Sequence, residues 1–268
     1  FLSATHATCT EIAKKGSHIP PERFVAFSSV QRAANPDLTL TPDTTFLWIQ
    51  GESLTSNKPA YVPAQTVSAT IRPTASVFKE PLIRQQTTIG LATWPTLAGA
   101  RLAGALEVIE REAFMIMWYN QLTLPRIDLS SLAGKSKNLD TLLTMCSKYR
   151  LKVHAIPMMT DAPSHTVCVI LEDETSLEPG FAFGLKAHRS MLVAVERAIT
   201  EALRARTGYR NFFLAGGSFD PHTPTDTIGH VDRLHYWGIP ENAKRLEFLI
   251  AGEELPYTFD APWEEDST

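Results

Sequence analysis

The stretch TLAGARLAGALEVIEREAFMIMWY, residues 96–119, decides how the rest of the chain is interpreted. It contains no proline, and its apolar residues recur at steps of four, three and four, at Leu102, Leu106, Ile109 and Ala113. This spacing predicts an amphipathic helix of about six turns with one apolar face. Thr96, which follows Pro95, is the expected N-terminal cap of this helix.

Two acids and an arginine lie at fixed spacing on the predicted helix. Glu107 and Glu110 are three residues apart and share a face, and Arg111 follows Glu107 by four residues. Two carboxylates placed in this way could hold Mg²⁺, which takes oxygen ligands, and an adjacent arginine could bind a phosphate with two hydrogen bonds. The spacing alone also fits an ordinary ion pair on a solvated helix face.

Shorter periodic stretches complete the predicted order of elements. Two further helices are expected at residues 139–150 and 189–208, and Gly208 is expected to end the second. Strands are expected at 46–54, 67–71, 151–159 and 165–173. The first strand should enter a turn at Gly51, and Gly180 and Gly184 should lie in ordinary turns. Helices that alternate with short strands indicate an α/β or α+β fold.

The composition of the 268 residues is that of a globular protein, with 44% apolar and 20% charged residues, and it excludes disordered and coiled-coil classes. The net charge is −4 and no basic stripe is visible, so no nucleic-acid partner is expected. No apolar run approaches the length of about 18 residues that crosses a membrane. The three cysteines form no paired motif, which suits a cytoplasmic protein. His222, His230 and His235 match no known metal-binding spacing.

The run GLATWPTLAGARLAGALEVIEREAFMIMW, residues 90–118, resembles the signature helix of the YcaO superfamily. Four further places agree with that family in order and spacing, and together they cover the chain from about residue 20 to about residue 210. They are FVAFSSVQ at 24–31, WIQGESL at 48–54 followed by VPAQTV at 62–67, PRIDLSSL at 125–132, and ERAITEALRAR at 196–206.

The resemblance implies a YcaO-type fold, with mixed sheets packed against long helices, in a single domain over residues 1–268 that lacks its N-terminal part. It implies ATP and Mg²⁺ as cofactors. The implied reaction is phosphorylation of a backbone amide oxygen in a ribosomal precursor peptide, which gives an azoline or, with an external sulfur source, a thioamide. The implied partners are a precursor peptide with a leader, a leader-binding protein or a TfuA protein, and other subunits of a homo- or hetero-oligomer.

The resemblance also assigns roles to particular residues. It implies that Glu107, Glu110 and Glu201 are Mg²⁺ ligands. Together with these acids, Arg111 and Arg197 would contact the nucleotide, and Arg197 precedes Glu201 by four residues on the third predicted helix.

Three departures from the family pattern leave other interpretations open. Gly99 stands where the family's T-x-x-E-A turn has a glutamate. The family has an early helix that supplies two ATP-site carboxylates, whereas Glu11 is the only acid in the first 20 residues here. Azoline-forming members usually end in a proline-rich tail, whereas the last eight residues here, APWEEDST, contain a single proline. A degenerate YcaO subunit, which binds a peptide or a partner enzyme without turning over ATP, is the alternative function. An unrelated globular protein whose helices mimic the pattern is the third.

Overall fold

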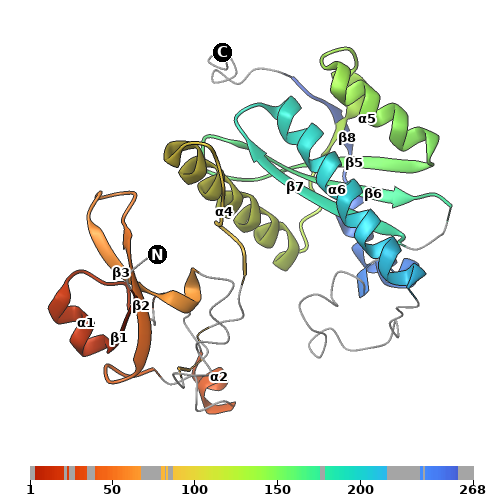
Figure 1. The fold of residues 1–268 in the computed structure, drawn as a ribbon. Coiled ribbons are helices and arrows are strands. Elements are labelled where there is room, and N and C mark those ends of the chain that lie inside the picture. The colour runs from red at the N-terminus through yellow and green to blue at the C-terminus, as the bar shows by residue number, and fades with distance from the viewer. Residues whose placement is uncertain are drawn as a thin grey trace. The chain divides into compact units, whose positions relative to one another are not determined.

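The computed structural model describes residues 4–20, 23, 28–34, 40–67, 80–81, 83, 87–175, 179–215, 236–237 and 239–258. Residue contacts divide the chain into two units, Phe1–Leu91 and Ala92–Thr268 (Figure 1). The strand expected at 67–71 lies outside the described residues except for Val67, and so do His222, His230 and His235.

The first unit is built on a three-stranded antiparallel sheet in the order β1-β2-β3. Its described elements are β1 (Ala4–Thr8), α1 (Cys9–Lys15), α2 (Ser29–Ala34), β2 (Thr45–Glu52), β3 (Pro59–Pro63) and the 3-10 turn η3 (Ala64–Thr66). Ile12, Phe46 and Trp48 form its core and are fully buried. The Trp48 indole donates a hydrogen bond to the carbonyl oxygen of Ala7 at 3.0 Å, which ties β2 to β1 through the core.

The predicted strand at 46–54 is confirmed as β2, but Gly51 continues the strand instead of starting a turn. The chain turns at Asn57, which has a φ of 53°. Helix α1 was not predicted, and it begins with a capping box. The Thr8 side chain accepts from the Glu11 amide, and the Glu11 carboxylate accepts from the Thr8 amide at 2.8 Å. Glu11, the only acid in the first 20 residues, therefore caps helix α1.

The second unit is built on a three-stranded antiparallel sheet in the order β5-β6-β7, with three long helices. Its main elements are α4 (Leu97–Tyr119), α5 (Lys137–Lys148), β5 (Leu151–Met158), β6 (His165–Asp173), β7 (Phe181–His188) and α6 (Met191–Leu214). The smaller ones are β4 (Arg126–Asp128), η4 (Leu129–Leu132), α8 (Pro240–Ala243), η5 (Lys244–Leu246), α9 (Glu247–Ile250) and β8 (Glu254–Pro256). Strands β4 and β8 pair in parallel. The α+β architecture expected from the sequence is confirmed.

Both faces of the β5-β6-β7 sheet are covered (Figure 1). On one face, Ala155 and Val169 join a core with Ala198 and Ile199 of α6. On the other face, the core consists of Ala113 and Met117 of α4, Ile156, Cys168 and Ile170 of the strands, and Leu246 and Leu249 near the C-terminus. Because β6 is buried on both sides, its sequence is an almost continuous apolar run, as the strand prediction for 165–173 assumed.

Helix α6 lies against β7 at a glycine. A Cβ atom added to Gly184 would lie 2.0 Å from the carbonyl oxygen of Ala198, so only glycine lets the helix come this close. The expectation that Gly184 marks an ordinary turn is therefore wrong. The predicted end of α6 at Gly208 is also wrong, since the helix continues to Leu214. Tyr209 is buried in the core, and this packing outweighs the low helix propensity of the glycine before it.

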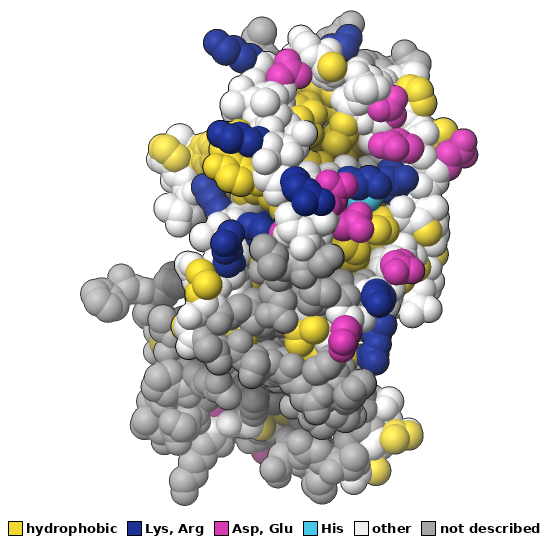
Figure 2. All heavy atoms as spheres, turned by 90° about the vertical axis from the view of Figure 1, so that its right-hand side faces the viewer, with side chains coloured by type: hydrophobic (Ala, Val, Ile, Leu, Met, Phe, Trp, Pro, Cys, Tyr) yellow, Lys and Arg dark blue, Asp and Glu magenta, His cyan; other side chains and the backbone are white. Residues whose placement is uncertain are grey.

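Lys and Arg side chains are intermixed with Asp and Glu on the face of the described residues drawn in Figure 2. This mixture agrees with the absence of a basic stripe in the sequence. Cys9, Cys146 and Cys168 are all buried, and none of the three is in a disulfide. Among the described helices, none has the length and apolar content that a bilayer-spanning segment needs.

A buried histidine links β4 to the main sheet. Arg126 Nη1 lies 2.8 Å from His154 Nδ1, and His154 Nε2 lies 2.8 Å from Glu172 Oε2. Because a guanidinium can only donate, Nδ1 accepts and Nε2 carries the proton that bonds to Glu172. Burial lowers the pKa of His154 below its ordinary value, although the bond to Glu172 opposes this shift.

The neutral state of His154 predicts how stability depends on pH. The unfolded chain gains a proton on this histidine below about pH 6.5, whereas the folded chain gains it at a lower pH, so the free energy of unfolding should decrease as pH falls from about 7 to about 5. His154→Gln should flatten this decrease. Denaturant unfolding of wild type and His154→Gln across this pH range measures the two slopes, and equal slopes would contradict the assignment.

Candidate active site

Helix α4 begins and ends where the sequence predicts. Thr96 caps it, and the Thr96 hydroxyl accepts a hydrogen bond from the Gly99 amide at 3.1 Å. Its buried face differs from the predicted one, because it consists of Gly104, Glu110, Ala113 and Met117. Leu102, Leu106 and Ile109 instead line a separate cavity, of about 350 Å³, together with Arg189. The apolar stripe in the sequence therefore marks a hollow beside the helix, and only Ala113 belongs to its packed face.

Glu110 is a buried carboxylate that contacts the edge of the sheet. Its side chain is 1% exposed, and Oε2 accepts a hydrogen bond from the Ala187 amide at 2.9 Å. Strand β7 is at the edge of the sheet, so this amide has no neighbouring strand to bond to. Lys186 Nζ lies 3.2 Å from the same oxygen. The buried Glu110 side chain thus satisfies one backbone amide at the edge of the sheet and also pairs with Lys186.

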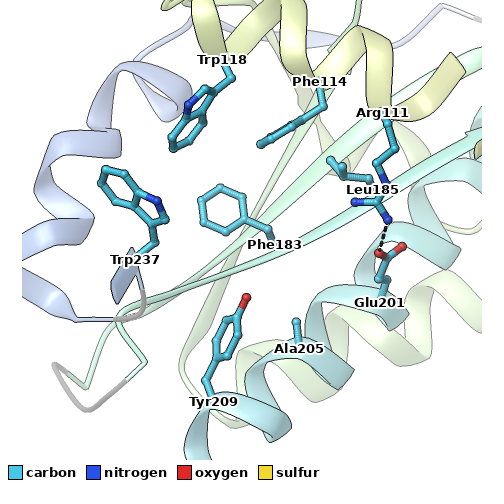
Figure 3. Close-up of a pocket in the computed structure, with 9 residues that line it drawn as sticks. All are labelled: Arg111, Phe114, Trp118, Phe183, Leu185, Glu201, Ala205, Tyr209 and Trp237. Carbon is cyan, nitrogen blue, oxygen red and sulfur yellow. Dashed lines mark hydrogen bonds and ion pairs between the residues drawn. The ribbon is translucent and has the colours of Figure 1, made fainter. Parts of the chain in front are cut away.

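The Arg111 guanidinium lies between three carboxylates. Its Nη2 is 3.4 Å from Glu201 Oε1 on α6, 3.6 Å from Glu110 Oε1, and 4.0 Å from Glu107 Oε1. Figure 3 shows Arg111 on α4 and Glu201 on α6 directed toward each other. We refer to Glu107, Glu110, Glu201, Arg111 and Lys186 as the acidic cluster. Four of the five residues implied by the family resemblance therefore meet at one place.

Among the five residues of the acidic cluster, three carboxylates lie beside two cationic side chains. Burial raises the pKa of Glu201 above its ordinary value, the Glu110 carboxylate adds to this, and Arg111 and Lys186 oppose it. A further cation in the acidic cluster would relieve this repulsion.

The donor set of the acidic cluster fits Mg²⁺ held partly by a phosphate. The carboxylates already surround a cationic group, although in the described part of the chain no three His, Cys, Asp or Glu side chains form a ready-made metal cage. Mg²⁺ is commonly bound by one or two carboxylates with water and substrate phosphates, so no such cage is required. The assignment of Glu107, Glu110 and Glu201 as ligands stays a prediction.

Arg197 lies outside the acidic cluster. It is exposed on α6, one turn before Glu201, and none of the ion pairs among the described residues joins it to the cluster. Burial lowers the pKa of His188, and Arg197 lowers it further, so the Arg197 charge acts on the end of β7. Its predicted contact with the nucleotide would have to be made from the rim of the site.

Gly99 allows an aromatic ring to lie against the first turn of α4. A Cβ atom added to Gly99 would be 2.0 Å from Cδ1 of the Trp94 indole. The position where the family pattern has a glutamate therefore contacts a tryptophan in this chain. This departure removes one carboxylate from the beginning of α4 and replaces it with an apolar surface.

Sequence reasoning missed Lys186 and an aromatic cavity next to the cluster. Both depend on strand β7. Its sequence, FAFGLKAH, includes a glycine and was not predicted as a strand. The cavity has a volume of about 370 Å³, and its lining is mostly aromatic. It is lined by Arg111, Phe114, Trp118, Phe183, Leu185, Glu201, Ala205, Tyr209 and Trp237 (Figure 3).

The family model described as YcaO cyclodehydratase, ATP- and Mg²⁺-binding, matches residues 3–268. The chain belongs to the YcaO family. The cofactors named for this family, ATP and Mg²⁺, are those expected from the sequence resemblance. A comparison with curated protein sequences found no match.

Several solved structures share the fold. A heterocyclase in complex with substrate and cofactor is 20% identical, with a TM-score of 0.69, over 96% of this chain and 33% of its own. The E. coli microcin synthetase McbBCD complex with pro-MccB17 bound is 17% identical, with a TM-score of 0.69, over 96% and 63%. YcaO from Methanopyrus kandleri, bound with AMPPCP and Mg²⁺, is 20% identical, with a TM-score of 0.55, over 78% and 48%. This YcaO chain thus spans between a third and two thirds of the length of these structures.

Proposed function

We propose that the chain acts in ATP- and Mg²⁺-dependent activation of a backbone amide in a ribosomal precursor peptide. The observation that carries this proposal is the acidic cluster, where carboxylates from α4 and α6 converge on one guanidinium. Membership of the YcaO family supports it. We also propose that both units belong to one YcaO-type domain, since the family match extends across them.

Four residues of the acidic cluster would have direct roles in this chemistry. Bound Mg²⁺–ATP would supply the phosphoryl group and the metal charge that phosphoryl transfer requires. Glu107, Glu110 and Glu201 would hold the metal, and the bond from the Ala187 amide fixes the orientation of Glu110. Arg111 would release its carboxylates and bind phosphate oxygens, a task suited to its planar, two-pronged guanidinium. Arg197 would contact the phosphates from the rim.

We favour an azoline over a thioamide as the product. In the first case a thiol or hydroxyl of the peptide would lose its proton and add to the neighbouring carbonyl carbon, and the former amide oxygen would take the γ-phosphoryl group of ATP and leave ADP. The C–O bond would then break as phosphate leaves, and the amide nitrogen would give up its proton to form the C=N bond of the ring. Two of the structural neighbours are described as a heterocyclase and a microcin synthetase, which supports ring formation. One neighbour is a complex with a bound precursor, so a leader-bearing peptide and partner subunits, a leader-binding protein among them, are the proposed partners.

A specific observation supports a second candidate function. Gly99 and Trp94 place an indole where the family pattern has a carboxylate, so this chain has one potential metal ligand fewer. A YcaO subunit that binds the peptide or a partner enzyme without turning over ATP would tolerate this replacement.

Titration calorimetry of Mg²⁺–ATP into the purified chain separates the two functions. An active enzyme should bind the nucleotide with Mg²⁺ present, and the heat of binding should disappear when EDTA removes the metal. A folded sample that gives no heat in either condition would overturn the proposal in favour of the subunit without ATP turnover.

A further inference from the structure

The aromatic cavity beside the acidic cluster is made by side chains from three well-packed elements and one short segment. Phe114 and Trp118 lie one turn apart on α4, Phe183 comes from β7, Tyr209 from α6, and Trp237 precedes α8. Figure 3 shows the Phe183 ring between the rings of Trp118, Phe114, Trp237 and Tyr209, with the Tyr209 hydroxyl directed toward Phe183. The cavity volume of about 370 Å³ is in the range of small-molecule pockets.

The rings that form the wall hold one another in place. Phe114 stacks on Trp118 with ring centroids 5.8 Å apart. Trp118 meets Trp237 edge to face at 5.3 Å, and Trp237 meets Tyr236 in the same way at 5.0 Å. Such contacts fix side-chain conformations before any ligand arrives. A ligand that enters therefore loses little binding energy to ordering the wall.

The cavity and the acidic cluster share two residues. Arg111 and Glu201 belong to the cluster and also line one end of the cavity. A molecule whose reacting group lies at the cluster therefore has its neighbouring atoms within reach of the aromatic rings. The cavity is a continuation of the site.

We propose that this cavity receives an aromatic or large apolar side chain of the substrate peptide, next to the amide that is activated at the acidic cluster. The inference rests on the proposed function and adds to it a preference for the sequence around the modified residue. An aromatic side chain can bury its surface here and make edge-to-face contacts with several rings at once.

The polar groups of the wall suit a side chain better than a nucleobase. A base presents several donors and acceptors along its edge, and each one that is buried without a partner costs binding energy. The two charged groups of the lining, Arg111 and Glu201, lie at one end and bond to each other. The Tyr209 hydroxyl supplies one donor and can accept a hydrogen bond, so it could pair with only part of the edge of a base.

The test uses the full chain and four short peptides with blocked ends, identical except for one residue beside a central cysteine: Phe, Leu, Ala or Asp. Dissociation constants are measured by calorimetry for wild type, Ala205→Phe and Thr207→Phe. Ala205 lines the cavity, so a phenylalanine there fills it, whereas Thr207 is exposed on the same helix and serves as the matched control. Mg²⁺–ATP binding is measured separately for each protein.

The Phe and Leu peptides should bind wild type and Thr207→Phe about tenfold more tightly than the Ala and Asp peptides. Ala205→Phe should remove this difference and still bind Mg²⁺–ATP. Equal affinities for all four peptides, or no peptide binding up to millimolar concentration, would overturn the inference. Loss of Mg²⁺–ATP binding in Ala205→Phe, with peptide binding unchanged, would overturn it in favour of a nucleobase in the cavity. Peptide discrimination without any Mg²⁺–ATP binding would support the cavity assignment and refute the proposed function.

Discussion

Glu107→Gln and Glu201→Gln should each weaken Mg²⁺–ATP binding by about a hundredfold or more and leave the fold intact. Residues that only support metal ligands already change metal affinity by about 10- to 100-fold, so the loss of a ligand charge should have at least this effect. Both side chains are partly exposed, and glutamine keeps their size. Titration calorimetry gives the affinity, and circular dichroism confirms the fold.

Glu112→Gln is the matched control, because Glu112 is exposed on α4 and lies outside the acidic cluster. It removes a carboxylate charge from the helix that also carries Glu107, and it should bind Mg²⁺–ATP as wild type does. Wild-type affinity in Glu107→Gln and Glu201→Gln would show that the acidic cluster is not the nucleotide site. Unfolding of both would assign these carboxylates to a structural ion-pair network.

Gly184→Ala should lower the free energy of unfolding by about 3 kcal/mol or more. The new methyl group would meet the backbone of α6 at Ala198 and Ala202, and a backbone cannot rotate away as a side chain can. Extra atoms in a well-packed core typically cost about 1–3 kcal/mol, and this contact belongs at or above the upper end. Urea unfolding monitored by fluorescence gives the value.

Gly208→Ala provides the comparison within α6, since a Cβ atom there would meet nothing within 4 Å. Alanine has a higher helix propensity than glycine, so this variant should gain up to about 1 kcal/mol. If Gly184→Ala proved as stable as wild type, α6 and β7 could not be as close as described. If both variants lost stability equally, the effect would come from α6 in general and not from its contact with β7.

Local signals in the sequence predicted the elements that depend on local physics. The cap at Thr96, the end of α4 and the strand β6 follow from capping, periodicity and an apolar run, all of which lie within a short stretch. Strand β7 could not be predicted in this way, because Gly184 is required by a helix that crosses it. The course of α6 past Gly208 likewise depends on the burial of Tyr209.

The candidate site likewise contains some residues that local sequence signals predict and others that only the folded structure brings together. The spacing of Glu107, Glu110 and Arg111 is local and was visible in the sequence. Glu201 was found through the family resemblance, since it is 90 residues from Arg111 and only the folded sheet brings the two together. Lys186 and the aromatic cavity depend on how α4 and α6 flank β7, and no short stretch of sequence contains that information.

Because the Glu110 carboxylate accepts a hydrogen bond from the Ala187 amide, it takes part both in the β5-β6-β7 sheet and in the acidic cluster. It ends the hydrogen-bond ladder of the sheet, and it belongs to the charge set that would receive the nucleotide. A cation bound at the cluster would draw electron density from Glu110 and weaken this hydrogen bond. We therefore expect the amide proton of Ala187 to exchange with solvent at a different rate when the site is occupied.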